Sequence, residues 1–167
     1  MASRNKKRAA AGLLVTAAAA AIFIMIVLGN FRWLILTNPD TGAEYGRFPV
    51  RVGSSFSVTF IHSVNKYPLT DYYEIRRDGI YVTKTKYANF GAGVQTELDE
   101  GESLSYDASD GSMIVSGFNR RMDRLIYIVG TVSDHTLTIG GRREISLRGL
   151  CGRNAKVLFT SRKLTGD

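Results

Sequence analysis

The chain has 167 residues, with 22 lysines and arginines against 15 acidic residues and a formal net charge of +7. Five of the basic residues flank one apolar run near the N-terminus: Arg4, Lys6, Lys7, Arg8 and Arg32. Setting these aside leaves 17 basic against 15 acidic residues, a near-neutral remainder that argues against nucleic-acid binding. The single cysteine excludes an intramolecular disulfide, and with it the class of small disulfide-stapled scaffolds.

The apolar run extends from Ala9 to Leu28 and contains no charged residue over 20 positions. A helix rises about 1.5 Å per residue, so this length matches the ~30 Å hydrocarbon core of a bilayer. The following Phe31-Arg32-Trp33 combines aromatic rings with a cation, as is typical of a helix end at the lipid–water interface. The pattern predicts an uncleaved signal-anchor. A cleaved signal peptide is the alternative, although the run is longer than usual and no A-x-A site closes it.

The distribution of charge predicts the orientation and the domain boundaries. Because N-terminal cations favour the cytoplasmic side, we expect residues 1–8 in the cytoplasm and a transmembrane helix at 9–29. A juxtamembrane linker is expected at 30–40 and an extracytoplasmic domain at 41–167. The expected location is therefore the cell membrane, crossed once, with the lipid bilayer as a partner.

Strand periodicity dominates the rest of the chain, with turns about every 8 to 12 residues. Strands are predicted at 55–61, 73–76, 80–87, 125–132, 137–139, 145–147 and 155–160. Asp78-Gly79 and Gly140-Gly141 predict hairpin turns, and the continuous apolar stretch 125–132 favours a central strand. The predicted fold is therefore mostly β: a single N-terminal transmembrane helix followed by an all-β domain. We expect that domain to be a two-layer antiparallel sandwich rather than a closed barrel.

The longest irregular segment is predicted at 88–103. It contains Phe90-Gly91-Ala92-Gly93, followed by the acidic cluster 97–102. Long loops on a rigid β frame often carry binding surfaces, so Phe90, Gly91 and Gly93 are candidate surface residues. The acidic cluster lacks the alternation of a calcium-binding EF-hand loop, so we interpret it as a solvated loop.

His62 and Ser63 are the residues most suggestive of chemistry. A hydrolase would combine them with Asp71 or Glu74 as the third member of a triad. Adjacent residues of a strand point to opposite faces, so this pair can cooperate only where the strand ends or bulges. The chain has no G-x-S-x-G elbow, which makes catalysis the less favoured interpretation.

A metal site has little support in the sequence. The chain has two histidines, His62 and His135, and no H-E-x-x-H, H-x-H or C-x-x-C spacing. A site formed across strands with Glu74 is geometrically possible, but structural roles for both histidines are favoured. We expect neither a metal nor another cofactor.

The stretch 60–73, FIHSVNKYPLTDYY, resembles the signature of the bacterial domain-of-unknown-function 1850 family. An aromatic segment ending in F-G-A-G at 90–93, the Asp110-Gly111 turn and an H-x-L segment at 135–137 also resemble that family. The resemblance spans about 48–147. Relatives place a glutamate shortly after the proline, a role that Asp71 or Glu74 could fill. The resemblance implies a particular gene neighbourhood. Genes of this family often lie beside the genes of TAXI-type TRAP transporters, which comprise a solute-binding protein and a fused permease.

We therefore expect a non-catalytic, membrane-anchored accessory of such a transporter, with the permease or the solute-binding protein as its partner. The candidate functional surface comprises His62, Ser63, Asp71, Glu74, Phe90, Gly91 and Gly93. Two alternatives remain: an extracytoplasmic hydrolase that uses His62 and Ser63, and a structural module for envelope assembly.

Overall fold

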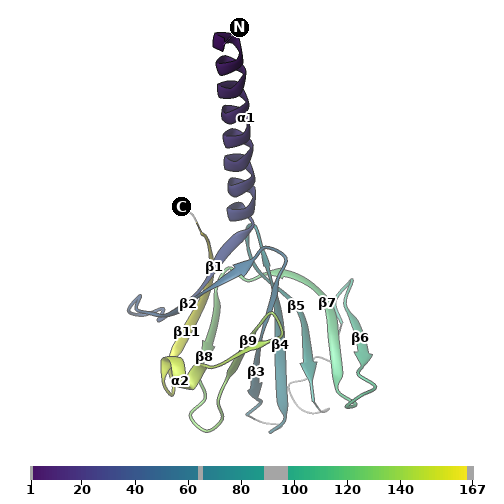
Figure 1. Cartoon of the computed structure of the whole chain (residues 1–167). Coiled ribbons are helices and arrows are strands. Elements are labelled where there is room, and N and C mark those ends of the chain that lie inside the picture. The colour runs from purple at the N-terminus through teal and green to yellow at the C-terminus, as the bar shows by residue number, and fades with distance from the viewer. Residues whose placement is uncertain (1, 64–65, 89–97, 165–167) are drawn as a thin grey trace.

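The computed structural model describes residues 2–63, 66–88 and 98–164, and of residues 2–13, 15 and 26 it describes the backbone alone. A long helix, α1 (Ala2–Gly29), projects from one end of a domain made of strands and a short helix, α2 (Leu147–Cys151) (Figure 1). The end of the domain that adjoins α1 is called the proximal end here, and the opposite end the distal end.

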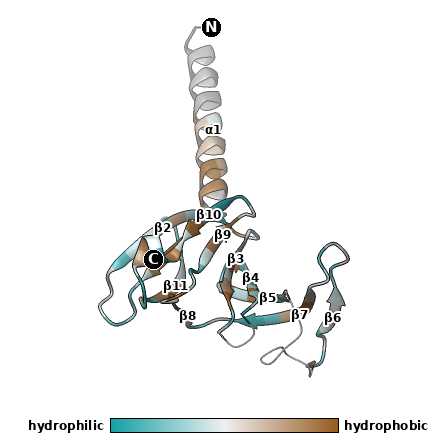
Figure 2. Ribbon diagram, turned by 90° about the horizontal axis from the view of Figure 1, so that it is seen from below, coloured by the Kyte–Doolittle hydropathy of each residue, from teal (hydrophilic) through white to brown (hydrophobic). Residues whose placement is uncertain are grey.

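The turns of α1 next to the domain are hydrophobic (Figure 2). Large apolar side chains are exposed along them, namely Leu14, Ile22, Phe23, Ile24, Met25, Val27 and Leu28. Within the described residues, no helix combines the length and apolar character that crossing a bilayer requires. The transmembrane segment expected at 9–29 is therefore not supported by the structure.

Two antiparallel sheets form the domain, which is mostly β as the sequence predicted. The smaller sheet has the order β2-β1-β11-β8, and the larger sheet has the order β10-β9-β3-β4-β5-β7-β6. The strands of the smaller sheet are β1 (Phe31–Thr37), β2 (Glu44–Arg51), β8 (Leu125–Ile128) and β11 (Lys156–Lys163). Those of the larger sheet are β3 (Ser55–Ile61), β4 (Pro68–Arg76), β5 (Gly79–Tyr87), β6 (Ser103–Tyr106), β7 (Met113–Arg121), β9 (Thr136–Ile139) and β10 (Arg143–Ser146).

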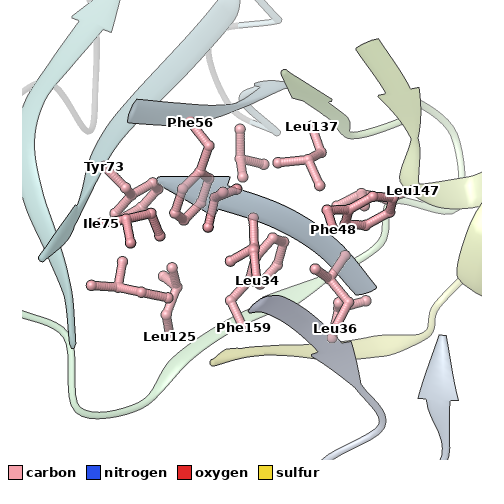
Figure 3. Close-up of a cluster of buried hydrophobic side chains, with 14 of the residues drawn as sticks. Leu34, Leu36, Phe48, Phe56, Tyr73, Ile75, Leu125, Leu137, Leu147 and Phe159 are labelled. Carbon is pink, nitrogen blue, oxygen red and sulfur yellow. The ribbon is translucent and has the colours of Figure 1, made fainter. Parts of the chain in front are cut away.

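The main hydrophobic core lies between the two sheets (Figure 3). Phe56 of β3 stacks on Tyr73 of β4, with ring centroids 4.9 Å apart, and on Phe159 of β11 at 5.8 Å. Leu34 and Leu36 of β1 are fully buried in the same core. Each such side chain contributes about 1.5–3 kcal/mol through burial, so this shared core holds the two layers together.

The structure differs from the sequence-based expectation in several parts: β2, β6 and β7 were not predicted, and two further segments have another role than expected. Residues 30–40, expected as a linker, contain β1, which lies between β2 and β11 and carries buried side chains. The aromatic flank that resembles a lipid-interface segment is thus the start of a strand, separated from α1 by Asn30 alone. The apolar stretch 125–132, expected as a central strand, forms the short β8 at one edge of the smaller sheet. Leu125, Tyr127 and Val129 pack in or against the core between the sheets, whereas Ile128 and Val132 are exposed.

Candidate functional site

Two connections, one from each sheet, enclose a pocket of about 260 Å³ at the distal end of the domain. One follows β3, and the other, residues 129–135, leads from β8 of the smaller sheet to β9 (Figure 1). We call this cavity the distal pocket. It is lined by Ile61, His62, Ser63, Lys66, Gly130, Thr131, Val132, Ser133 and His135.

The first connection begins where β3 ends, at Ile61 opposite Pro68 of β4. The N–H of His62 donates to the carbonyl of Tyr67, and the N–H of Lys66 donates to the carbonyl of His62, each at 2.9 Å. Side chains alternate between the two faces only within a strand. Because β3 ends before His62, this alternation does not force the side chains of His62 and Ser63 to opposite faces. Both residues line the distal pocket. The sequence analysis required the strand to end or bulge here for the two residues to cooperate, and the strand does end here.

His135 enters the same pocket from the second connection. Its ring stacks on Phe60, with centroids 5.0 Å apart, and lies edge-on to Tyr127 at 6.0 Å. The N–H of Gly130 donates to Nδ1 across 3.2 Å, so in the neutral ring Nε2 carries the proton. Burial lowers the pKa of His135 below its ordinary value, and Arg148 acts in the same direction against the opposing effect of Asp134. The neutral form is therefore favoured.

The second connection is fixed by contacts with the start of α2. Asp134 accepts hydrogen bonds from the N–H groups of His135 and Arg148, at 2.7 and 2.9 Å, and from the hydroxyl of Ser146. The Arg148 side chain donates back to the carbonyl of Val132 at 2.8 Å. Gly130 is required for space, because a Cβ there would lie 2.2 Å from the carbonyl oxygen of Ser133. These contacts give one wall of the pocket a defined shape.

A hydrogen-bonded group lies between the sheets behind His135. Tyr127 of β8 donates to the Asp71 carboxylate at 2.7 Å, and its hydroxyl lies 2.6 Å from that of Tyr73. Thr85 donates to the other oxygen of Asp71 at 2.8 Å. Burial, above all other causes, raises the pKa of both tyrosines well above the ordinary value, so both hydroxyls stay protonated. This group joins the two sheets and supports the ring of His135.

The structure separates the acidic residues that the sequence grouped with His62 and Ser63. Asp71 is bound by Thr85 and Tyr127 rather than exposed in the pocket. Glu74 lies at the proximal part of β4, opposite Ser55, where it accepts a hydrogen bond from Arg76 at 2.8 Å. Neither carboxylate lines the distal pocket, so the triad considered from the sequence is not assembled.

The remaining candidates fall in two groups. Phe90, Gly91 and Gly93 lie outside the described residues. Of the three residues considered as metal ligands, His62 and His135 line the same pocket. Glu74 lies at the other end of β4. Within the part of the chain that the structure describes, no three potential ligands are grouped for a metal ion.

Sequence reasoning missed the contribution of the second connection to this site. The sequence favours a structural role for His135, and it gives no reason to single out Gly130, Val132 or Tyr127. The short spacing between Gly130 and His135, directly after an apolar strand, is the signal that could have directed attention there. Pairing that loop with His62 requires the position of β8 opposite β3 and β4, which sequence alone does not provide.

The comparison with protein families matches residues 56–147, more than half of the chain, to the family described as Domain of unknown function (DUF1850). The chain belongs to this family. The match begins in β3 and ends at the first residue of α2, so the family region contains both connections that line the distal pocket. The resemblance inferred from the sequence is confirmed. Comparisons with curated proteins and with solved structures give no match.

Proposed function

We propose that this member of the family is a membrane-anchored, extracytoplasmic accessory protein of a TAXI-type TRAP transporter. In this proposal the domain is non-catalytic, and the distal pocket docks the solute-binding protein or the permease. The observation that carries the proposal is that α1 lies at one end of the domain (Figure 1), whereas the two connections that line the distal pocket lie at the other. An anchor at one end leaves the pocket directed away from the bilayer.

The anchor part of the proposal is supported by the surface of α1. The large apolar side chains that the structure describes in α1 are all exposed, and they follow four N-terminal cations. Exposed apolar side chains of this extent favour contact with lipid, and the preceding cations favour a cytoplasmic N-terminus. The domain would then be extracytoplasmic.

The docking part is supported by the chemistry of the distal pocket. Hydroxyls of Ser63 and Ser133, the ammonium of Lys66 and the neutral His135 ring offer hydrogen-bond donors, while its described lining contains no acidic side chain. The lining also includes two exposed apolar side chains, Ile61 and Val132. A lining that combines hydrogen-bond donors and a cation with exposed apolar side chains suits a partner that presents an acidic side chain. Partner docking is favoured over hydrolysis because Asp71 and Glu74 are both engaged elsewhere.

Site-specific photo-crosslinking in membranes tests this function. A photoreactive residue at Val132 should give a crosslinked product that contains the permease or the solute-binding protein. The same group at Arg153, which is exposed beyond α2, should not give this product. In parallel, His62→Ala combined with Ser63→Ala should reduce uptake by the transporter without loss of the folded protein. Unchanged uptake after deletion of the gene would contradict the proposal, and a crosslink to envelope-assembly components would favour the structural alternative.

A further inference from the structure

A second pocket, of about 340 Å³, lies at the proximal end, where α1 meets the smaller sheet. Its wall comes from the end of α1, the start of β1, the turn between β4 and β5, and the end of β11 (Figure 1). The lining residues are Leu28, Gly29, Asn30, Phe31, Arg32, Arg77, Lys163 and Leu164. We call it the basic pocket, because three of these side chains are cationic.

Two of the cations are held opposite each other by the sheet. Arg32 of β1 and Lys163 of β11 are direct partners in the antiparallel register. Like charges at directly opposed positions destabilise a pair of strands. An anion bound between them would remove this repulsion, so the arrangement favours an anionic ligand.

The guanidinium of Arg32 is fixed in position before any ligand binds. Its Nε donates to the hydroxyl of Ser161 at 2.7 Å, and its two terminal nitrogens donate to the carbonyls of Arg77 and Ser161 at 2.7 and 2.9 Å. Each terminal nitrogen carries two N–H bonds and uses one of them in these contacts. One N–H on each terminal nitrogen therefore remains for a ligand. A positioned guanidinium of this kind matches the oxygen pair of a phosphate.

The basic pocket has no acidic counterpart in the described part of the chain. None of the ion pairs between described residues includes Arg32, Arg77 or Lys163. Asp78, the carboxylate next to Arg77 in sequence, accepts a hydrogen bond from Tyr81 at 2.7 Å instead. Among the described residues, the positive charge of the basic pocket is therefore not neutralised by an ion pair.

We propose that the basic pocket binds the phosphate of an anionic phospholipid headgroup, with Arg32, Arg77 and Lys163 around the phosphate. The apolar side chains of Leu28, Phe31 and Leu164 then face the glycerol and the first carbons of the acyl chains. The choice of a lipid over a soluble phosphate rests on the anchoring by α1 proposed above, which would place this pocket at the headgroup level. The expected class is a phosphodiester with net negative charge, such as phosphatidylglycerol.

The test uses the full chain in a non-ionic detergent, titrated with short-chain phosphatidylglycerol, short-chain phosphatidylcholine or glycerol phosphate. The wild-type protein should bind phosphatidylglycerol at least about tenfold more tightly than either other compound. Arg77→Gln combined with Lys163→Gln should weaken that binding about tenfold or more, as expected from the loss of a charge-assisted contact. Arg153→Gln, which removes one exposed cation distant from α1, should bind like the wild type.

Each other outcome overturns the proposal in a defined way. Equal binding of phosphatidylcholine would show that net charge is not recognised, and equal binding of glycerol phosphate would assign the pocket to a soluble phosphate. Unchanged binding by the double variant would place the lipid elsewhere. Extraction of cell membranes with alkaline carbonate tests the anchor separately. Release of the protein would contradict anchoring by α1, while the affinities measured in detergent would still decide whether the pocket prefers this phosphate.

Discussion

Tyr127 and Asp71 join the two sheets through one hydrogen bond of 2.7 Å, from the phenol of β8 to the carboxylate of β4. The same phenol lies 2.6 Å from the hydroxyl of Tyr73, whose side chain is buried. A half-buried carboxylate such as that of Asp71 retains part of its desolvation cost when it loses such a donor. The bond therefore links the stability of the domain to the support of the distal pocket.

Tyr127→Phe should lower the free energy of unfolding by about 1–3 kcal/mol, because it leaves Asp71 and Tyr73 each without one hydrogen-bond partner. Urea denaturation followed by fluorescence measures the change. Tyr106→Phe is the matched control, since Tyr106 is 64% exposed, and it should alter stability by less than about 0.5 kcal/mol. Equal effects of the two substitutions would contradict the structural role of Tyr127.

Stability should decrease as the pH falls below about 6.5. Burial holds the pKa of His135 below its ordinary value of 6.5, so the unfolded chain binds a proton more readily than the folded chain. Above pH 6.5 the neutral His135 ring makes its full contribution to the free energy of unfolding. This contribution is lost as the pH falls toward the lower pKa that His135 has in the folded protein. Denaturation at pH 7.5 and 5.5 should show this loss. His135→Phe keeps a ring against Phe60 and should reduce the loss, and an unchanged loss in this variant would contradict the role of His135.

Gly130→Ala should destabilise the protein by about 1–3 kcal/mol and weaken partner crosslinking from Val132. The added Cβ would lie 2.2 Å from the carbonyl oxygen of Ser133, so the backbone of the second connection has to move. Gly29→Ala is the control, because a Cβ at that position has no atom within 4 Å. Crosslinking yield and urea denaturation check both effects. A Gly130→Ala protein with wild-type stability and yield would disprove the need for glycine.

Cys151 should react slowly with thiol reagents while the protein is folded. Burial raises the pKa of its thiol to about 11 from the ordinary 9.0, so the thiolate fraction near neutral pH is about a hundredfold smaller. The rate of reaction with a disulfide reagent should therefore rise with pH toward a midpoint near 11. Unfolding in urea should restore a midpoint near 9. A folded protein with the lower midpoint would place Cys151 in solvent.

Local patterns in the sequence predicted much of the larger sheet. Alternation in 55–61 and the Asp78-Gly79 and Gly140-Gly141 turns correspond to β3 and to the β4–β5 and β9–β10 hairpins. The smaller sheet was harder to predict, because β1 directly follows the apolar run and its aromatic residues are equally typical of a lipid interface. Its pairing with β11 joins residues more than 120 positions apart, as in Arg32 and Lys163, and no local pattern encodes that distance.

The candidate site was predictable only in part for the same reason. His62 and Ser63 were identified from their residue types, and both line the distal pocket. Asp71 was grouped with them by proximity in sequence, but its neighbour in space is Tyr127, which is 56 residues away. Residue type thus indicated one wall of the pocket, whereas the opposite wall depends on how the two sheets pack.

The single residue between α1 and β1 has a mechanical consequence. The N–H of Asn30 donates to the carbonyl of Val27 in α1, and its carbonyl accepts from the N–H of Val52 beyond β2, so the joint is secured on both sides. With a single residue between them, a change in the direction of α1 acts directly on the start of β1. A seven-residue strand spans roughly 23 Å, which sets the height at which an anchored domain carries its distal pocket. If α1 anchors the domain as proposed above, the protein would act as a spacer of fixed length and would engage only partners that reach this distance from the bilayer.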